Sequence, residues 1–161
     1  MRSHRWTRVL GLVVAVGSAG VASASEYVPG RFSAALNAGV SLPAQSVDNS
    51  GIASAFGLTL TYWGSESFLF DVSPTVLGSR GVMLLAGPRL RLGQGPVGMN
   101  LGLQVGPVFR GNSSSLLIVS PQLGVEARLS GGNFVGVNYA GDFTFYPSLR
   151  HRLFVSLGHR F

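Results

Sequence analysis

Six charged or amide side chains recur at alternate positions of the segments between residues 68 and 129. Pairing these segments as symmetric antiparallel hairpins places Asp71 opposite Arg89, Arg91 opposite Asn100, Asn100 opposite Glu126, and Arg128 one pleat further. Charges gathered in a narrow interior must be paired, because an unpaired buried charge costs several kcal/mol. Two interpretations stay open: a charge-paired plug that stabilises a closed barrel, or a gate that passes water or small ions.

A second group of charges falls in connections at the opposite ends of the same segments, with His151 between its last two members. The group consists of Arg80, Arg110, Arg150 and Arg152. The guanidinium group is a planar fork of donors that matches phosphate oxygens. These residues are therefore candidates for binding a phosphorylated partner, with solvated loop charges as the alternative.

The residues needed for catalysis are not arranged convincingly in this sequence. Beyond residue 24 the histidines are His151 and His159. His151 is close in sequence to Ser148 and Tyr146, and no serine and acid are evident near His159. A nucleophile needs a base within hydrogen-bond reach, so we expect no enzyme activity. No metal-ligand cluster or phosphate loop is present either, and we expect no cofactor.

Period-two alternation dominates the chain after residue 30 and predicts about eight strands of roughly ten residues. The expected strands cover residues 32–42, 52–62, 68–76, 82–92, 99–109, 117–129, 135–143 and 153–161. An even number of strands joined by short hairpins is what a closed up-and-down barrel requires. Proline recurs within four of these strands, at Pro74, Pro88, Pro107 and Pro121. Because proline removes a ladder hydrogen bond, we expect bulges or kinks there.

The two faces of these strands differ in a way that decides which face is outside. One face carries Leu, Val, Phe and Tyr, whereas the other carries mainly Gly, Ser, Thr, Asn and Ala with an occasional charge. Such small side chains cannot cover a protein in water, but they fit the crowded interior of an eight-stranded barrel. The sequence therefore predicts an apolar face that points outward into lipid.

Composition supports this interpretation. Charged residues make up 11 % of the 161-residue chain, all twelve basic residues are Arg, and the mean hydropathy is +0.36. A hydrated surface usually has about a quarter to a third charged residues. The arginines are scattered without a basic run, so we expect no nucleic-acid binding.

The N-terminal residues 1–24 have the pattern of a secretory signal peptide, which leaves residues 25–161 as the barrel domain. Arg2, Arg5 and Arg8 precede an apolar run, and Ala22-Ser23-Ala24 has the form of a cleavage site. The apolar run is too short to cross a bilayer, which takes about 20 residues. The absence of Cys fits an exported protein that relies on no disulfide.

The last strand alternates to the end of the chain, with its outward positions at Leu153, Val155, Leu157, His159 and Phe161. Together with the signal peptide and the strand rhythm, this ending resembles the small eight-stranded outer-membrane barrels, including the membrane domain of the outer-membrane protein A group. The resemblance implies that the barrel assembly machinery reads the terminal aromatic residue as an insertion signal. It also implies location in the Gram-negative outer membrane, among membrane lipids and lipopolysaccharide, with the short turns and both termini at the periplasmic end.

Within this resemblance, aromatic residues at the turn end would form the periplasmic girdle, namely Phe32, Tyr62, Trp63, Phe68, Phe134 and Phe161. The arginines at the other end would contact lipopolysaccharide phosphates. Our first hypothesis is a structural or interaction barrel with a closed lumen, whose envelope protein partner is unknown. The alternatives are a narrow channel, a lipid A-modifying enzyme and a soluble periplasmic ligand-binding barrel.

Overall fold

The computed structural model describes residues 31–44, 51–78, 81–93, 95–110, 113–144 and 149–161. Eight antiparallel strands close into one barrel in sequence order, because β8 pairs with β1 as well as with β7. The strands are β1 (Phe32–Pro43), β2 (Ala53–Trp63), β3 (Phe68–Val76), β4 (Val82–Leu92), β5 (Val97–Arg110), β6 (Ser113–Arg128), β7 (Asn133–Thr144) and β8 (Leu149–Arg160). The predicted all-β, closed eight-stranded up-and-down barrel is therefore confirmed.

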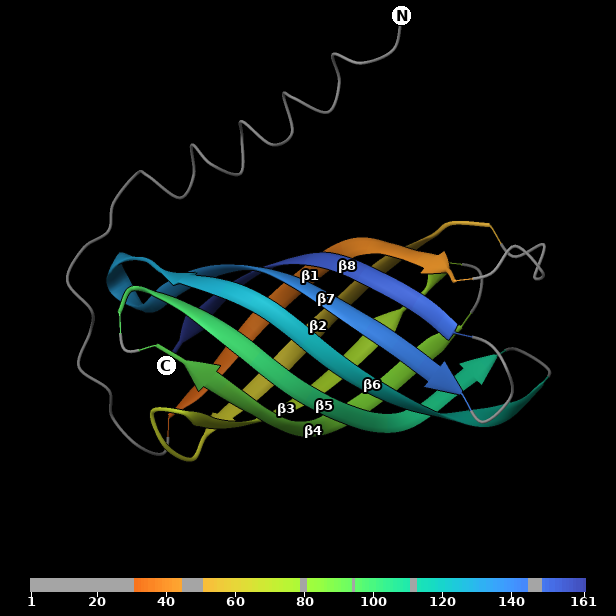
Figure 1. Cartoon of the computed structure of the whole chain (residues 1–161), viewed down its shortest axis with the longest axis horizontal. Helices are drawn as coiled ribbons and strands as arrows, with labels where there is room; N and C mark the ends of the chain where they lie inside the picture. The colour runs from red at the N-terminus through yellow and green to blue at the C-terminus, as the bar shows by residue number, and fades with distance from the viewer. Residues whose placement is uncertain (1–30, 45–50, 79–80, 94, 111–112, 145–148) are drawn as a thin grey trace, which may run out of the picture.

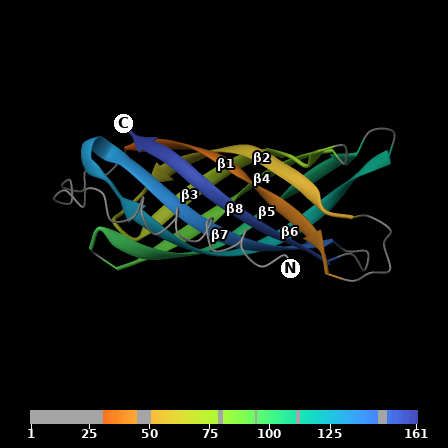
Figure 2. The ribbon, with the colours of Figure 1, turned by 90° about the horizontal axis from the view of Figure 1, so that it is seen from above.

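The two ends of the barrel differ. The turn end carries the connections after β2, β4 and β6 together with Phe161, whose backbone N–H donates to the carbonyl of Phe32 (Figure 1). The connection after β6 contains the short 3₁₀ turn η2 (Ser130–Gly132), where Gly131 and Gly132 have φ values of 69° and 80° that favour glycine. The loop end is opposite. Figure 2 shows the strands tilted across the barrel between these ends.

The outward face is apolar all round the barrel, as predicted. Leu36 of β1, Leu101 of β5 and Leu157 of β8 are 69 %, 43 % and 61 % exposed, and comparable residues lie on the other strands. Polar side chains such as Ser33, Asn100 and Gln104 are instead buried. This arrangement is inverted relative to a barrel in water, and a continuous apolar exterior of this kind needs apolar surroundings. No helix among the described residues is long and apolar enough to cross a membrane.

The strand prolines interrupt the ladders, and beside one of them, Pro107, the β5–β6 register also shifts, between Val108 and Arg110. The β2–β3 pairing is broken between Gly57/Thr75 and Leu60/Val72, on either side of Pro74, and it resumes in the same register. Comparable gaps occur at the other three prolines. The expected irregularity is therefore present beside Pro107, whereas a bulge at Pro74, Pro88 and Pro121 was a wrong expectation, because the register there is unchanged. A missing donor removes single hydrogen bonds, and the other neighbouring strand pairs without interruption past these three prolines.

Three groups of residues named above lie wholly or partly outside the described residues. They are the expected signal peptide (residues 1–24), Arg80, and the Tyr146–Ser148 region of the last loop. The other candidate residues are all described.

Candidate functional site in the barrel lumen

The candidate site is the barrel interior, which is filled in successive levels from the turn end to the loop end. Successive side chains of a strand point to opposite faces of the sheet. Every second residue of each strand therefore points inward and lines the lumen. The lumen has four levels: a floor at the turn end, a charge layer, a belt of amides and hydroxyls, and a filling of the loop end.

The floor at the turn end is built around Trp63. Its indole N–H donates to Ser33 Oγ at 3.1 Å, and the guanidinium carbon of Arg160 lies 3.6 Å from the centroid of its ring. Phe134 is buried beside Gly158, where a Cβ would lie 2.2 Å from the Phe134 ring. Trp63 and Phe134 are 1 % and 4 % exposed, so their assignment to an outward aromatic girdle was wrong. Both occupy inward positions, and their rings close the end of the lumen.

The charge layer lies above this floor and contains the predicted lumen residues. Asp71 accepts from Thr61 Oγ1 at 2.7 Å, and its Oδ2 lies 3.0 Å from Arg89 Nε. Glu126 carboxylate oxygens lie 3.8 Å from Arg89 Nη1 and 3.7 Å from Arg91 Nε. The structure thus brings together charges from β3, β4 and β6.

The remaining members of the predicted set border this layer. Asn100 pairs with Arg91 in the β4–β5 register, as expected, and is buried. The guanidinium carbon of Arg128 lies 5.6 Å from the centroid of the Trp63 ring. Two other expected pairings were wrong, because Asp71 lies opposite Gly87, and Glu126 lies opposite Gly98. Arg89 therefore reaches Asp71 diagonally, which a long side chain allows.

A belt of amides and hydroxyls encircles the lumen above the charge layer and was missed by the sequence analysis. Hydrogen bonds of 2.6–3.1 Å run from Asn138 through Ser156, Asn37, Thr59, Ser73 and Gln104 to Gln122. These side chains come from every strand except β4, where Gly87 lets the backbone of β5 approach closely, since a Cβ there would lie 2.0 Å from the Leu103 carbonyl oxygen. Their alternation on the small-residue faces was the available signal. Two cavities of about 20 Å³ each border the belt.

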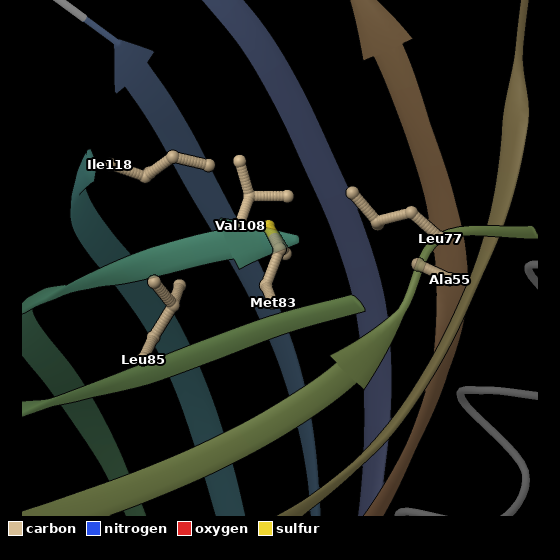
Figure 3. Packing of buried hydrophobic residues seen from close by; sticks show 6 residues of the cluster. All are labelled: Ala55, Leu77, Met83, Leu85, Val108 and Ile118. Atoms are coloured by element: carbon tan, nitrogen blue, oxygen red, sulfur yellow. The ribbon is translucent and has the colours of Figure 1, made fainter. Parts of the chain in front are cut away.

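The loop end of the lumen is filled from two sides. On one side an ion pair is fully satisfied: Arg152 Nε and Nη2 donate to Asp142 at 2.6 and 2.9 Å, and Ser120 Oγ bonds both residues. On the other side apolar residues pack together, as Figure 3 shows: Ala55, Leu77, Met83, Leu85, Val108 and Ile118. The predicted inner face of small polar residues is therefore incomplete, because one side of this end is apolar.

Of the four arginines expected to bind phosphate, the three that the structure describes do not form one surface. Arg152 is 3 % exposed and faces the lumen, so its assignment to an exposed contact was wrong. The neighbouring residue Arg150 is half-buried and donates to Ser41 Oγ and O at 3.0 Å. Arg110 is exposed at the loop end. Arg150 and Arg152 are two residues apart on β8 and therefore share its inward face, whereas His151 between them points outward.

The two histidines lie on the outward face. Nδ1 of His151 contacts the Tyr139 hydroxyl, and their rings are stacked with centroids 5.7 Å apart. His159 Nδ1 lies 3.0 Å from Asn133 Oδ1 and packs edge-on against Phe161. His159 thus shares the outward face of β8 with the other residues of the predicted insertion signal. Among the described residues no cluster of His, Asp and Glu could hold a metal ion.

Comparison with known proteins identifies the fold but does not identify an activity. No protein-family model matches the chain, and no curated protein matches its sequence significantly. The N-terminal β-barrel domain of Pseudomonas aeruginosa OprF matches with a TM-score of 0.56 and 13 % identity, over 82 % of this chain and 99 % of that one. The attachment invasion locus protein Ail of Yersinia pestis matches with a TM-score of 0.56 and 13 % identity, over 83 % of this chain and 100 % of that one.

A de novo designed transmembrane β-barrel matches equally well, with a TM-score of 0.58 and 15 % identity, over 85 % of this chain and 100 % of that one. Because a designed barrel and natural proteins match alike at such low identity, the likeness concerns the backbone arrangement and not a shared activity. The chain therefore has the closed eight-stranded fold of the small outer-membrane barrels.

Proposed function

We propose that this chain is a structural or interaction barrel of the Gram-negative outer membrane whose lumen is closed by its own side chains. The observation that carries the proposal is the combination of an apolar exterior with an interior filled by two ion-pair levels, a hydrogen-bonded belt and an apolar cluster. The solved barrels that share the fold support the location. The proposal includes no catalysis: in the described residues, the side-chain hydrogen bonds of His151 and His159 go to Tyr139 and Asn133.

The proposal also includes the route to the membrane. Residues 1–24 would direct export and be removed, and the barrel assembly machinery would bind the outward face of the last strand during insertion. In the folded barrel this face, from Leu153 to Phe161, remains exposed beside β1, with Leu157 61 % and Phe161 66 % exposed. It is thus available to lipid once the barrel has closed.

The location is tested by fractionating cells that express the chain. We expect it to sediment with the outer membrane, to resist carbonate extraction, and to migrate faster on gels unboiled than boiled, because closed barrels stay compact in detergent until heated. Trypsin digestion of intact and permeabilised cells would report which end faces outward. Recovery in the aqueous fraction without a mobility shift would contradict the proposal and favour a soluble periplasmic barrel.

Lipopolysaccharide is the proposed ligand of the loop end. Arg110 supports this contact, because its side chain is exposed at that end, whereas Arg150 lies on the inward face of β8 and donates to Ser41. Guanidinium groups beside an apolar wall match the phosphates and acyl chains of that lipid. Arg152 takes no part, since it is buried against Asp142.

Replacing Arg110 by Gln is expected to weaken lipopolysaccharide binding roughly fivefold, near the upper limit of about 1 kcal/mol for an exposed ion pair. Binding would be measured by fluorescence titration of the barrel in neutral-lipid vesicles. Arg31→Gln is the matched control, because Arg31 is also exposed but lies at the turn end. Equal losses in both variants would show general charge attraction and contradict a defined contact.

A narrow channel for water or small ions is the second candidate, and the polar cavities beside the belt favour it. Passage would require the charge layer and the apolar filling of the loop end to part. The closed-lumen proposal predicts no single-channel steps from the wild-type barrel in planar bilayers. If steps occur and the exchange Asp71→Arg with Arg89→Asp alters their conductance, the channel replaces the closed barrel as the function.

A further inference from the structure

The barrel wall has a seam between each pair of neighbouring strands, and inward side chains join the two strands of nearly every seam by a hydrogen bond or an ion pair. In strand order these contacts are Asn37–Thr59, Thr61–Asp71, Asp71–Arg89, Gln104–Gln122, Ser120–Asp142, Asp142–Arg152 and Ser156–Asn37. Among the described residues, no side-chain contact of this kind joins β4 to β5. The β4–β5 seam therefore depends on its backbone ladder and on apolar packing.

The backbone ladder of the β4–β5 seam is broken twice. Pro88 and Pro107 have no N–H to donate, and the pairing is interrupted beside each of them. Between the two interruptions one pair remains, Ala86 with Val105. The β8–β1 seam, which closes the barrel, pairs without a gap from Ser33 to Pro43. Fewer backbone hydrogen bonds therefore oppose the separation of β4 from β5.

The inner side of this seam is apolar toward the loop end. Met83 and Leu85 of β4 and Val108 of β5 are at most 1 % exposed and belong to the apolar cluster (Figure 3), and Gly106 has no side chain. In a membrane such packing opposes separation weakly, because lipid chains are as apolar as the side chains they would replace. A polar contact across a seam has no such substitute in lipid.

The belt limits this weak region on the side of the turn end. Gln104 of β5 donates to Ser73 Oγ of β3 at 3.1 Å, so one hydrogen bond passes over β4 at that level. Nearer the turn end, Arg89 of β4 contacts Asp71 and Glu126 in the charge layer. The weak region is therefore the loop-end half of the seam, where Met83–Ala86 lie beside Val105–Val108.

We propose that the barrel wall opens sideways between β4 and β5 in this half, and that the hydrocarbon chain of a neighbouring lipid then contacts the apolar cluster. The opening separates Met83–Ala86 from Val105–Val108 and leaves the charge layer and the Trp63 floor in place. The lumen therefore stays closed along its axis. The inference rests on the proposed membrane location, which the fractionation and the gel shift test separately.

Hydrogen exchange of the backbone amides tests the opening, in the folded barrel in phosphatidylcholine bicelles. We expect the amides of Ala86 and Val105 to be at least about tenfold less protected than those of Ala38 and Val155. The last two are paired in the unbroken β8–β1 seam and also face outward, which makes them matched controls. Equal protection at the two seams would overturn the proposal.

Restoring a backbone donor should hold the seam closed. Pro107→Ala returns an N–H to β5, and we expect exchange at Ala86 and Val105 to slow by about fivefold, the factor that one hydrogen bond supplies. Pro121→Ala is the control, because Pro121 also faces outward but interrupts the β6–β7 seam. The gel shift verifies that both variants are folded. An equal effect of the two variants on Ala86 would contradict an opening specific to β4–β5.

Contact with lipid is measured by cross-relaxation from lipid methylene protons to side-chain methyl groups of the same sample. Met99 is 49 % exposed and should give a strong signal in any case. Met83 and Ala140 are both 0 % exposed, but only Met83 lies at the β4–β5 seam. We expect a signal at Met83 that weakens in Pro107→Ala, and none at Ala140. A Met83 signal no stronger than that of Ala140 would overturn the proposed contact with lipid.

Discussion

The Arg152→Met variant is expected to lose about 3–5 kcal/mol of unfolding free energy, a large share of the stability of a single domain. Arg152 is 3 % exposed and donates two hydrogen bonds to Asp142, at 2.6 and 2.9 Å. Removing the guanidinium leaves a buried carboxylate whose remaining side-chain partner is Ser120. Urea unfolding in lipid vesicles, followed by Trp63 fluorescence and by the gel shift, measures the loss.

The double variant Arg152→Met with Asp142→Asn is the control. An amide keeps the hydrogen bond with Ser120 and carries no charge, so we expect most of the lost stability to return. If the double variant is as unstable as Arg152→Met, the loss comes from packing of the long side chain against Phe154, whose ring centroid lies 5.7 Å from the guanidinium carbon. That outcome would contradict the electrostatic explanation.

The Leu103→Arg variant is expected to be destabilised by about 2–4 kcal/mol, because the charge would stand at the middle of a lipid-facing surface. Leu103 lies near the centre of β5 and is 46 % exposed. An exposed leucine on a protein in water tolerates this change with little cost. The same unfolding measurement in vesicles therefore reports what surrounds the barrel.

Leu92→Arg is the matched control for depth. Leu92 has nearly the same exposure, 48 %, but ends β4 at the turn end. An arginine there reaches the interface, so the expected cost is about 0–1 kcal/mol. Equal costs at the two positions would show that the exterior has no apolar midplane and would contradict the membrane location.

The outward and inward faces could be predicted because they depend on a period of two that the chain shows directly. Leu101 and Leu157 alternate with small or polar residues, and a closed barrel then requires the smaller set to be inside. The number of strands followed from the spacing of the turns. The four prolines were visible too, but their effect was not, because a neighbouring strand can hold the register where one hydrogen bond is lost.

The members of the charge layer could likewise be predicted, since charges on inward faces of adjacent strands must approach one another. Which charges pair could not. Arg89 contacts Asp71 diagonally because the register of β3 and β4 places Gly87, and not Arg89, opposite the acid. A register shift of two residues keeps the same face inward, so alternation alone cannot detect it.

The sequence by itself determined the barrel, its strand count and its apolar exterior, because period-two patterning acts locally along each strand. Only the tertiary structure paired Arg152 with Asp142 diagonally across the β7–β8 hairpin and placed Trp63 beneath Arg160 of a strand remote in sequence. Only the closed barrel brought the amides and hydroxyls of seven strands into one belt. The physical reason is that burial depth and partners depend on strand tilt, register and closure, which are properties of the assembled sheet.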